Sequence, residues 1–124
     1  MKKSWRPQTK LVHGGSLRSQ YGEMSEGIFL TQGFLYENSA AAEARFKGEE
    51  EGFIYARYGS PTNAMFEQRM CALEGAEDAR ATASGMAAVS AAILCQLKAG
   101  DHIVAARALF GSCRWGVETL APKY

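Results

Sequence analysis

The sequence lacks an excess of charge of one sign and has no long apolar run. Its 124 residues carry 14 Lys and Arg against 13 Asp and Glu, which gives a net charge of +1. Nucleic acid and anionic membrane surfaces select for clustered basic residues, so neither is favoured as a partner. The longest uncharged stretch, residues 81–97, is interrupted by polar side chains and is shorter than the roughly 20 apolar residues of a spanning helix. We therefore expect no membrane segment, and a buried core element at this place.

Cysteine and histidine are too few and too scattered for a disulfide framework or a metal centre. Cys71, Cys95 and Cys113 lie far apart in apolar surroundings, with no C-x-x-C and no histidine at ligand spacing. Inert thiols in a reducing compartment, and no metal, are expected. The basic amino terminus has no apolar stretch behind it, so it does not resemble a secretory signal. The expected location is cytoplasmic.

The first part of the chain has the pattern of an extended arm. With 47% hydrophobic residues and nearly balanced charge, the chain should fold. Residues 1 to about 35 show no long periodic segment, so this part must lie on the rest of the chain or on another subunit, anchored by residues 28–30 and 34–36. A short helix capped by Ser39 and ended by Gly48 is expected over residues 39–46. The arm and this helix make up residues 1–51.

From residue 52 onward the pattern is that of an α/β fold. Helices are expected over residues 63–74, 86–98 and 110–120, the first capped by Thr62 and stopped by Gly75. Short apolar strands are expected over residues 79–83 and 102–106. Helix and strand in alternation predict a layered fold with a parallel sheet, and the helix from residue 86, apolar on all sides, should lie between layers. Two strands are too few for such a sheet, so the chain looks incomplete.

Two places could bind an anion. Ser84, Gly85 and Met86 open a helix after an expected strand, where free N–H groups and the helix dipole favour phosphate, although many Ser-Gly turns bind nothing. Tyr55 and Arg57, two residues apart in an extended segment, would project to the same side and offer a hydroxyl and a guanidinium to one anion. The alternative is a surface arginine beside a half-buried tyrosine. Phe110 would lie at the carboxyl end of the sheet, where α/β folds bind ligands, but a core role is the more common one.

Several motifs in order resemble one family. They are residues 52–62 (GFIYARYGSPT), 73–76 (LEGA), 83–88 (ASGMAA) and 97–103 (LKAGDHI). These runs resemble the Cys/Met-metabolism enzymes, the pyridoxal-phosphate-dependent trans-sulfuration family. In the arm, residues 9–15, 17–20 and 25–34 are similar to the O-succinylhomoserine sulfhydrylase branch. The resemblance spans nearly the whole chain but only about the amino-terminal third of the family's length.

The resemblance implies a fold and a set of roles. The fold would be the fold-type I pyridoxal-phosphate transferase, a three-layer α/β/α domain with a mostly parallel sheet, of which residues 52–124 form the first part of the cofactor-binding large domain. Tyr55 and Arg57 would reach the cofactor phosphate of a neighbouring subunit in a homotetramer built as a dimer of dimers. Ser84, Gly85 and Met86 would hold that phosphate from within one subunit. Phe110 stands where the family usually has a tyrosine stacked on the pyridine ring, so stacking is kept and the hydroxyl is lost.

The catalytic lysine of the family is expected beyond residue 124. No lysine of this chain stands in the matching place, and Lys10, although its context is superficially similar, lies in the arm. None of the 124 residues is therefore expected to be catalytic, and the chain alone should be inactive. The full-length enzyme would convert the small molecules O-succinyl-L-homoserine and sulfide to L-homocysteine and succinate, a step of methionine biosynthesis.

Other readings stay open. Cystathionine γ-synthase and O-acetylhomoserine sulfhydrylase share every motif quoted. From another class, the chain could be a non-catalytic truncation or an oligomerisation piece, and a small phosphate-binding module unrelated to the family is a third possibility.

Overall fold

The computed structural model describes residues 4–124 and divides the chain into two compact units, Met1–Arg80 and Ala81–Tyr124. The boundary expected at residues 51 and 52, between arm and large domain, refers to the complete fold and stays a prediction. Among the described residues, no helix is both long and apolar enough to cross a bilayer.

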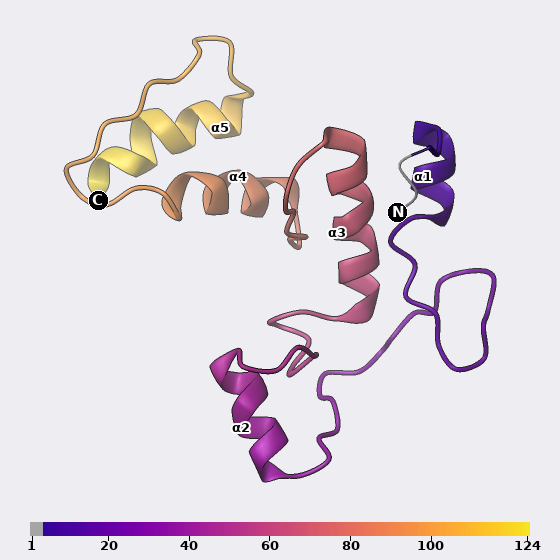
Figure 1. Ribbon diagram of the computed structural model, residues 1–124. Coiled ribbons are helices and arrows are strands. Elements are labelled where there is room, and N and C mark those ends of the chain that lie inside the picture. The colour runs from indigo at the N-terminus through magenta and orange to yellow at the C-terminus, as the bar shows by residue number, and fades with distance from the viewer. Residues whose placement is uncertain (1–3) are drawn as a thin grey trace. The chain divides into compact units, whose positions relative to one another are not determined.

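The first unit contains three helices, labelled in Figure 1 as α1 (Pro7–His13), α2 (Ser39–Lys47) and α3 (Pro61–Glu74). Helix α1 was not expected, because seven residues are too few to show a period. It begins with Pro7 at its first position, where a missing N–H costs nothing. α1 packs against α3, which stabilises a helix too short to stand alone.

Helices α2 and α3 confirm the expected segments but not the expected caps. The side chain of Asn38, not Ser39, accepts a hydrogen bond from the N–H of Ala41. Ser60, not Thr62, caps α3 by accepting from the N–H of Asn63 at 3.3 Å. In both cases the chain turns into the helix one or two residues earlier than expected. Gly48 and Gly75 end their helices in the left-handed conformation, as expected.

The hydroxyl of Thr62 is used elsewhere, because it accepts the N–H of Phe29 at 2.9 Å. This bond fixes the arm to α3, and three further contacts fix it to residues 53–55. The rings of Phe34 and Phe53 lie 5.3 Å apart, Tyr36 donates its hydroxyl proton to the carbonyl of Ile54, and Gly33 pairs with Tyr55 in an antiparallel bridge. The arm is thus anchored by its aromatic residues as expected.

The aliphatic residues of the two expected anchors do not pack on this chain, so their part in anchoring the arm stays a prediction. Ile28, Leu30 and Leu35 are 75%, 94% and 96% exposed. In extended backbone successive side chains point to opposite sides, so when Phe29, Phe34 and Tyr36 face inward, their neighbours face outward.

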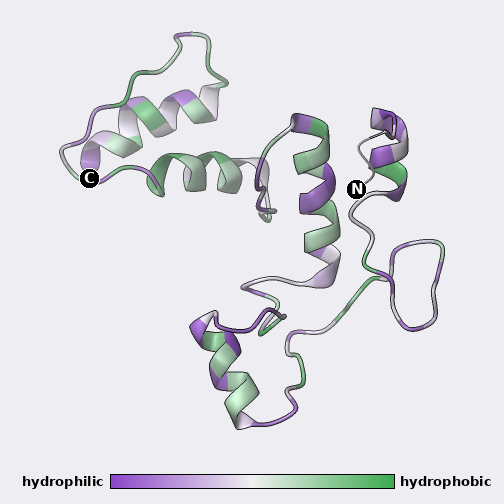
Figure 2. Ribbon diagram, in the orientation of Figure 1, coloured by the Kyte–Doolittle hydropathy of each residue, from purple (hydrophilic) through white to green (hydrophobic). Residues whose placement is uncertain are grey.

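The second unit consists of α4 (Gly85–Leu94), α5 (Gly111–Trp115), a π-helical turn (Gly116–Leu120) and a 3₁₀ turn (Ala121–Lys123). α4 ends four residues before the expected end at residue 98. The carboxylate of Asp101 accepts the N–H of Lys98 at 2.9 Å, and this closes a separate turn over residues 98–101. Apolar residues run all along α4 in Figure 2, and none of its side chains is buried within this chain.

The two strands expected over residues 79–83 and 102–106 are not formed as strands in residues 4–124. Both segments are irregular and make no ladder there. A strand is defined by hydrogen bonds to a second strand, and these segments have no such partner among the described residues. The antiparallel bridge between Gly33 and Tyr55 is the strand-like pairing that the described part of the chain contains.

Candidate functional site

Tyr55 and Arg57 are brought together by a turn rather than by the extended segment expected from the sequence. Tyr58 and Gly59 both donate their N–H to the carbonyl of Tyr55, at 2.8 and 3.2 Å. Arg57 lies on this turn, and its guanidinium carbon is 4.8 Å from the centre of the Tyr55 ring and 5.5 Å from that of Tyr58. The predicted neighbours are therefore adjacent, and Tyr58 joins them as a second aromatic ring that the sequence analysis missed.

The guanidinium of Arg57 is available to an anion. The side chain is exposed, and no carboxylate within residues 4–124 forms an ion pair with it. Two aromatic faces hold it in place, each worth about 0.5–1 kcal/mol at an exposed site. A planar fork of N–H donors, oriented and without an anionic partner, suits a phosphate or carboxylate.

The arm also contacts this turn. Gln32 accepts the N–H of Ala56 on its backbone carbonyl at 2.8 Å, and its side-chain oxygen lies 3.3 Å from the hydroxyl of Tyr55. Gln32 was missed by the sequence analysis, because a glutamine in an arm carries no pattern. The contact depends on a pairing of residues more than twenty positions apart.

The second candidate, at the start of α4, has the geometry of an open helix end. Ser84 caps the helix by accepting from the N–H of Ala87 at 3.1 Å, and its carbonyl accepts from Ala88 at 3.0 Å. The N–H groups of Gly85 and Met86 belong to the first turn, which has no intrahelical acceptors. A Cβ added at Gly85 would meet nothing within 4 Å, so an oxyanion could approach the backbone closely. The residues present fit a phosphate group.

Phe110 precedes α5, and its carbonyl accepts the N–H of Arg114 at 2.9 Å. Its ring is 74% exposed, so within this chain it is a free apolar face and not part of a core. The structure thus places Tyr55 and Arg57 together in the first unit, and Ser84, Gly85 and Met86 together in the second, which also holds Phe110.

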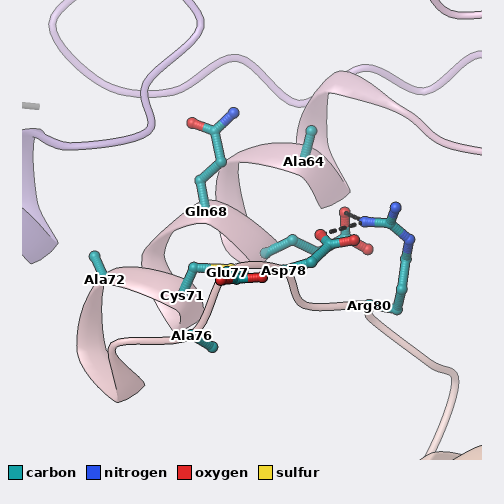
Figure 3. A pocket seen from close by; sticks show the side chains of 9 residues that line it. Ala64, Gln68, Cys71, Ala72, Ala76, Glu77, Asp78 and Arg80 are labelled. Atoms are coloured by element: carbon teal, nitrogen blue, oxygen red, sulfur yellow. Dashed lines mark hydrogen bonds and ion pairs between the residues drawn. The ribbon is translucent and has the colours of Figure 1, made fainter.

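Two hollows of the chain have a different character. Figure 3 shows the one beside α3, about 520 Å³ in volume, where Arg80 lies 2.8 Å from Asp78 and 3.9 Å from Glu67. One arginine therefore faces two carboxylates, and residues 4–124 contain no group of three or more His, Cys, Asp or Glu side chains that could hold a metal ion. The other hollow, about 310 Å³, lies along α4 and is lined mainly by apolar side chains, with Cys113 at its edge.

Comparisons with known proteins define the class to which these features belong. The sequence model of the Cys/Met metabolism PLP-dependent enzymes matches residues 8–124, and the chain belongs to this family. O-succinylhomoserine sulfhydrylase of Mycobacterium tuberculosis is 49% identical over 118 residues, covering 88% of this chain and 29% of that protein. The enzyme of the same name from Pseudomonas aeruginosa is 45% identical and covers 84% and 26%.

Solved structures give the same fold. A Campylobacter jejuni protein described as an O-acetylhomoserine (thiol)-lyase superposes with a TM-score of 0.93 at 26% identity, covering 98% of this chain and 30% of that one. Its crystal structure carries N'-pyridoxyl-lysine-5'-monophosphate. The metB protein of Corynebacterium glutamicum gives a TM-score of 0.84 at 30% identity, with the same coverage.

These findings confirm three of the sequence predictions. The family is the one that the motifs resembled, it is pyridoxal-phosphate-dependent, and the fold is part of a fold-type I α/β enzyme. The chain spans about 30% of the length of the relatives that it matches. The irregular segments at residues 79–83 and 102–106 therefore belong to a fold of which most lies outside these 124 residues.

Proposed function

We propose that this chain is part of a pyridoxal-phosphate-dependent sulfhydrylase that converts O-succinyl-L-homoserine and sulfide to L-homocysteine and succinate. The observation that carries the proposal is the pair of anion-binding elements, an unpaired arginine oriented by tyrosine rings and an open helix end. Both fit the phosphate of the cofactor. The choice of substrate is supported by the two O-succinylhomoserine sulfhydrylases at 45–49% identity.

Each residue has a physical role in this proposal. Arg57 and the hydroxyl of Tyr55 bind phosphate oxygens, and the N–H groups of Gly85 and Met86 bind others at the positive end of α4. The hydroxyl of Ser84 accepts the N–H of Ala87, so the N–H groups of Gly85 and Met86 are the ones left for the phosphate. Phe110 offers a ring face to a planar aromatic group and has no proton to exchange. The cofactor, when bound, supplies the electron sink for the reaction, and the protein supplies binding and orientation.

The proposal includes two elements outside these residues. The lysine that binds the cofactor covalently would come from the remainder of the protein, because no lysine here stands in the matching place. Tyr55 and Arg57 would serve the site of a neighbouring subunit in a homo-oligomer, expected to be a tetramer, in the cytoplasm. The arm supports an intermolecular role, because three of its aliphatic side chains are left exposed.

A second candidate activity is favoured by other relatives. L-Methionine γ-lyases of Porphyromonas gingivalis and Fusobacterium nucleatum are 40% and 41% identical over 103 residues. An O-acetyl-L-homoserine sulfhydrylase of Corynebacterium glutamicum is 37% identical over 117 residues. Cystathionine γ-synthase activity, in which cysteine replaces sulfide, is a further alternative to the proposed activity.

One set of assays separates these activities. The full-length protein, loaded with pyridoxal phosphate, would be given the succinyl or acetyl ester with sulfide or cysteine, and separately L-methionine. We expect the highest kcat/KM with the succinyl ester and sulfide. A preference for the acetyl ester, for cysteine or for methionine cleavage would each replace the proposed substrate while leaving the cofactor assignment intact.

The alternative from another class is that the 124-residue chain exists as such without activity. The intact mass of the protein isolated from its native source decides this. If the mass corresponds to 124 residues, the chain is a non-catalytic piece. If borohydride fixes the cofactor to a residue within 1–124, the expectation that the covalent lysine lies elsewhere is wrong.

A further inference from the structure

Gln32 occupies a special place, because it contacts the Tyr55 turn with both its backbone and its side chain. The backbone carbonyl accepts the N–H of Ala56 at 2.8 Å, and Gly33 pairs with Tyr55 in the antiparallel bridge. The side-chain oxygen lies 3.3 Å from the phenol oxygen of Tyr55. The backbone contacts fix the position of residue 32, so the carboxamide reaches Tyr55 without being needed to hold the arm.

The direction of the hydrogen bond between Tyr55 and Gln32 decides whether Tyr55 can also donate to an anion. A phenol has one proton to donate, and when Tyr55 gives it to Gln32 none is left for an anion. A carboxamide has an oxygen on one side and an NH₂ on the other, and a rotation of 180° exchanges them. With the NH₂ toward Tyr55, Gln32 donates to the phenol oxygen and the phenol proton is free.

The separation leaves the amide free to turn. In this structure Tyr55 donates its hydroxyl proton to Oε1 of Gln32 at 3.3 Å, whereas hydrogen bonds from a hydroxyl to an oxygen are usually 2.5–3.0 Å long. The bond is therefore weak, and little is lost when an anion takes the phenol proton and the NH₂ of Gln32 turns toward the phenol oxygen. The guanidinium of Arg57 lies over the ring of Tyr55 and fixes its plane, so the rotation of the amide decides the direction of the phenol proton.

We infer that Gln32 is a positioning residue for the Tyr55 hydroxyl. Its NH₂ donates to the phenol oxygen, and the phenol proton then points to a phosphate oxygen bound by Arg57. The inference rests on the proposed cofactor role of Tyr55 and Arg57. It adds an arm residue that touches neither cofactor nor substrate and acts through Tyr55. Two hydrogen bonds in series polarise each other, which strengthens the second one.

The test uses the full-length protein and two ligands that differ only in the phosphate. Dissociation constants of pyridoxal phosphate and of pyridoxal are measured by spectroscopic titration of the apoprotein, and their ratio isolates the phosphate contribution. For Gln32→Leu we expect pyridoxal phosphate to bind about three- to tenfold more weakly, the effect of one net hydrogen bond. Pyridoxal should bind as it does to the unmodified protein.

Two further variants define the mechanism. Gln32→Glu keeps the shape but offers only acceptors, so it holds the phenol proton and places a negative charge near the phosphate. We expect it to lose more affinity for pyridoxal phosphate than Gln32→Leu. In a Tyr55→Phe background, Gln32→Leu should have no further effect, because the two residues act in series. Glu37→Gln, an exposed change in the same arm, is the matched control and should change neither constant.

Different results contradict the role of Gln32 and the proposed phosphate site. If Gln32→Leu leaves the ratio within about twofold, or weakens both ligands equally, the positioning role is wrong while the cofactor role of the family stands. If it weakens pyridoxal phosphate as much in the Tyr55→Phe background as in the unmodified protein, Gln32 does not act through Tyr55. If the unmodified protein does not distinguish pyridoxal phosphate from pyridoxal, the proposed phosphate site and this inference are both wrong. Equal unfolding temperatures of the apoprotein variants show that the fold is kept.

Discussion

The two units of the chain bury their surfaces in opposite ways. In Met1–Arg80 the arm is fixed to α3 and to the Tyr55 turn by polar and aromatic contacts, and Met65 is only 2% exposed. In Ala81–Tyr124 no helix buries a side chain, although α4 is apolar along its whole length. The first unit thus has one buried apolar side chain and a set of polar and aromatic contacts, whereas the second presents apolar surface that the rest of a fold-type I domain would cover. We therefore expect the apolar side chains that are exposed in the second unit to be covered in the complete fold.

The largest effects should come from the apolar side chains. Met65→Ala should cost about 2–5 kcal/mol of unfolding free energy, because it leaves a cavity in the first unit. Leu94 on α4 is 59% exposed here, and at a true surface its replacement by alanine would change stability by less than about 0.5 kcal/mol. In the full-length protein we expect Leu94→Ala to cost about as much as Met65→Ala. Urea unfolding of both variants measures this, and a cost below 0.5 kcal/mol for Leu94→Ala would show that α4 is an ordinary surface helix.

The next effect concerns the attachment of the arm. Arg69 on α3 forms an ion pair with Glu26 and donates hydrogen bonds to the carbonyl of Gly14 at 3.3 Å and the hydroxyl of Ser16 at 3.4 Å. One arginine thus joins two distant parts of the arm to one helix. Arg69→Ala should cost about 1.5–3 kcal/mol, the range of hydrogen bonds to charged groups. It should also open residues 14–26 to proteolysis.

Arg114→Ala is the matched control in the second unit. Its ion pair with Glu118 is exposed and lies within one turn, so its loss should cost about 0.3–0.5 kcal/mol. If the two variants have equal effects on stability and proteolysis, Arg69 does not hold the arm in the way that the contacts indicate.

The helix caps give a smaller and more local effect. Ser60 caps α3 and is 6% exposed, whereas Ser84 caps α4 and is exposed. Replacing either by alanine should cost about 0.5–2 kcal/mol, and Ser60→Ala should lie at the upper end because the site is buried. Hydrogen exchange of the Asn63 and Ala87 amides reports each cap directly. Thr62→Ala should release the arm and leave the hydrogen exchange of the Asn63 amide unchanged. Faster exchange at Asn63 in this variant would show that Thr62 is the cap.

The sequence predicted those features that depend on neighbours in the chain. The stops at Gly48 and Gly75 follow from local backbone preference, and the motifs around Tyr55 and Gly85 identified the family. The caps were wrong by one or two residues, because Asn38, Ser39, Ser60 and Thr62 are all chemically suitable and the backbone path chooses among them.

The features that failed depend on distant partners. The strands over residues 79–83 and 102–106 need other strands to pair with, and neither is formed in the described part of this chain. The contact between Gln32 and Tyr55 joins residues 23 positions apart, and nothing in the local sequence marks it. Anchors at Phe29, Phe34 and Tyr36 were foreseeable as apolar residues. The side to which Phe34 and Tyr36 point is set by contacts with residues 53–55, and Phe29 is fixed through its backbone N–H by Thr62.

The smallest effect concerns the carboxylate of Glu23, which contacts Ser19 across a loop of the first unit. The hydroxyl of Ser19 donates to Glu23 at 2.6 Å and its N–H donates at 2.8 Å, and these bonds lower the pKa of Glu23 from 4.5 to about 2. A lowered pKa means that the folded state favours the charged form, so the loop is stabilised above pH 4.5 and loses this contribution as the pH falls toward 2. An NMR titration should find the Glu23 carboxyl still ionised at pH 3.5, and Ser19→Ala should move its pKa back toward 4.5. Since Glu23 is only half-buried and its bonds lie within one loop, global stability should hardly change. A pKa near 4.5 in the unmodified protein would show that the loop is not closed in solution. The polar contacts of the first unit would then not extend to this part of its arm.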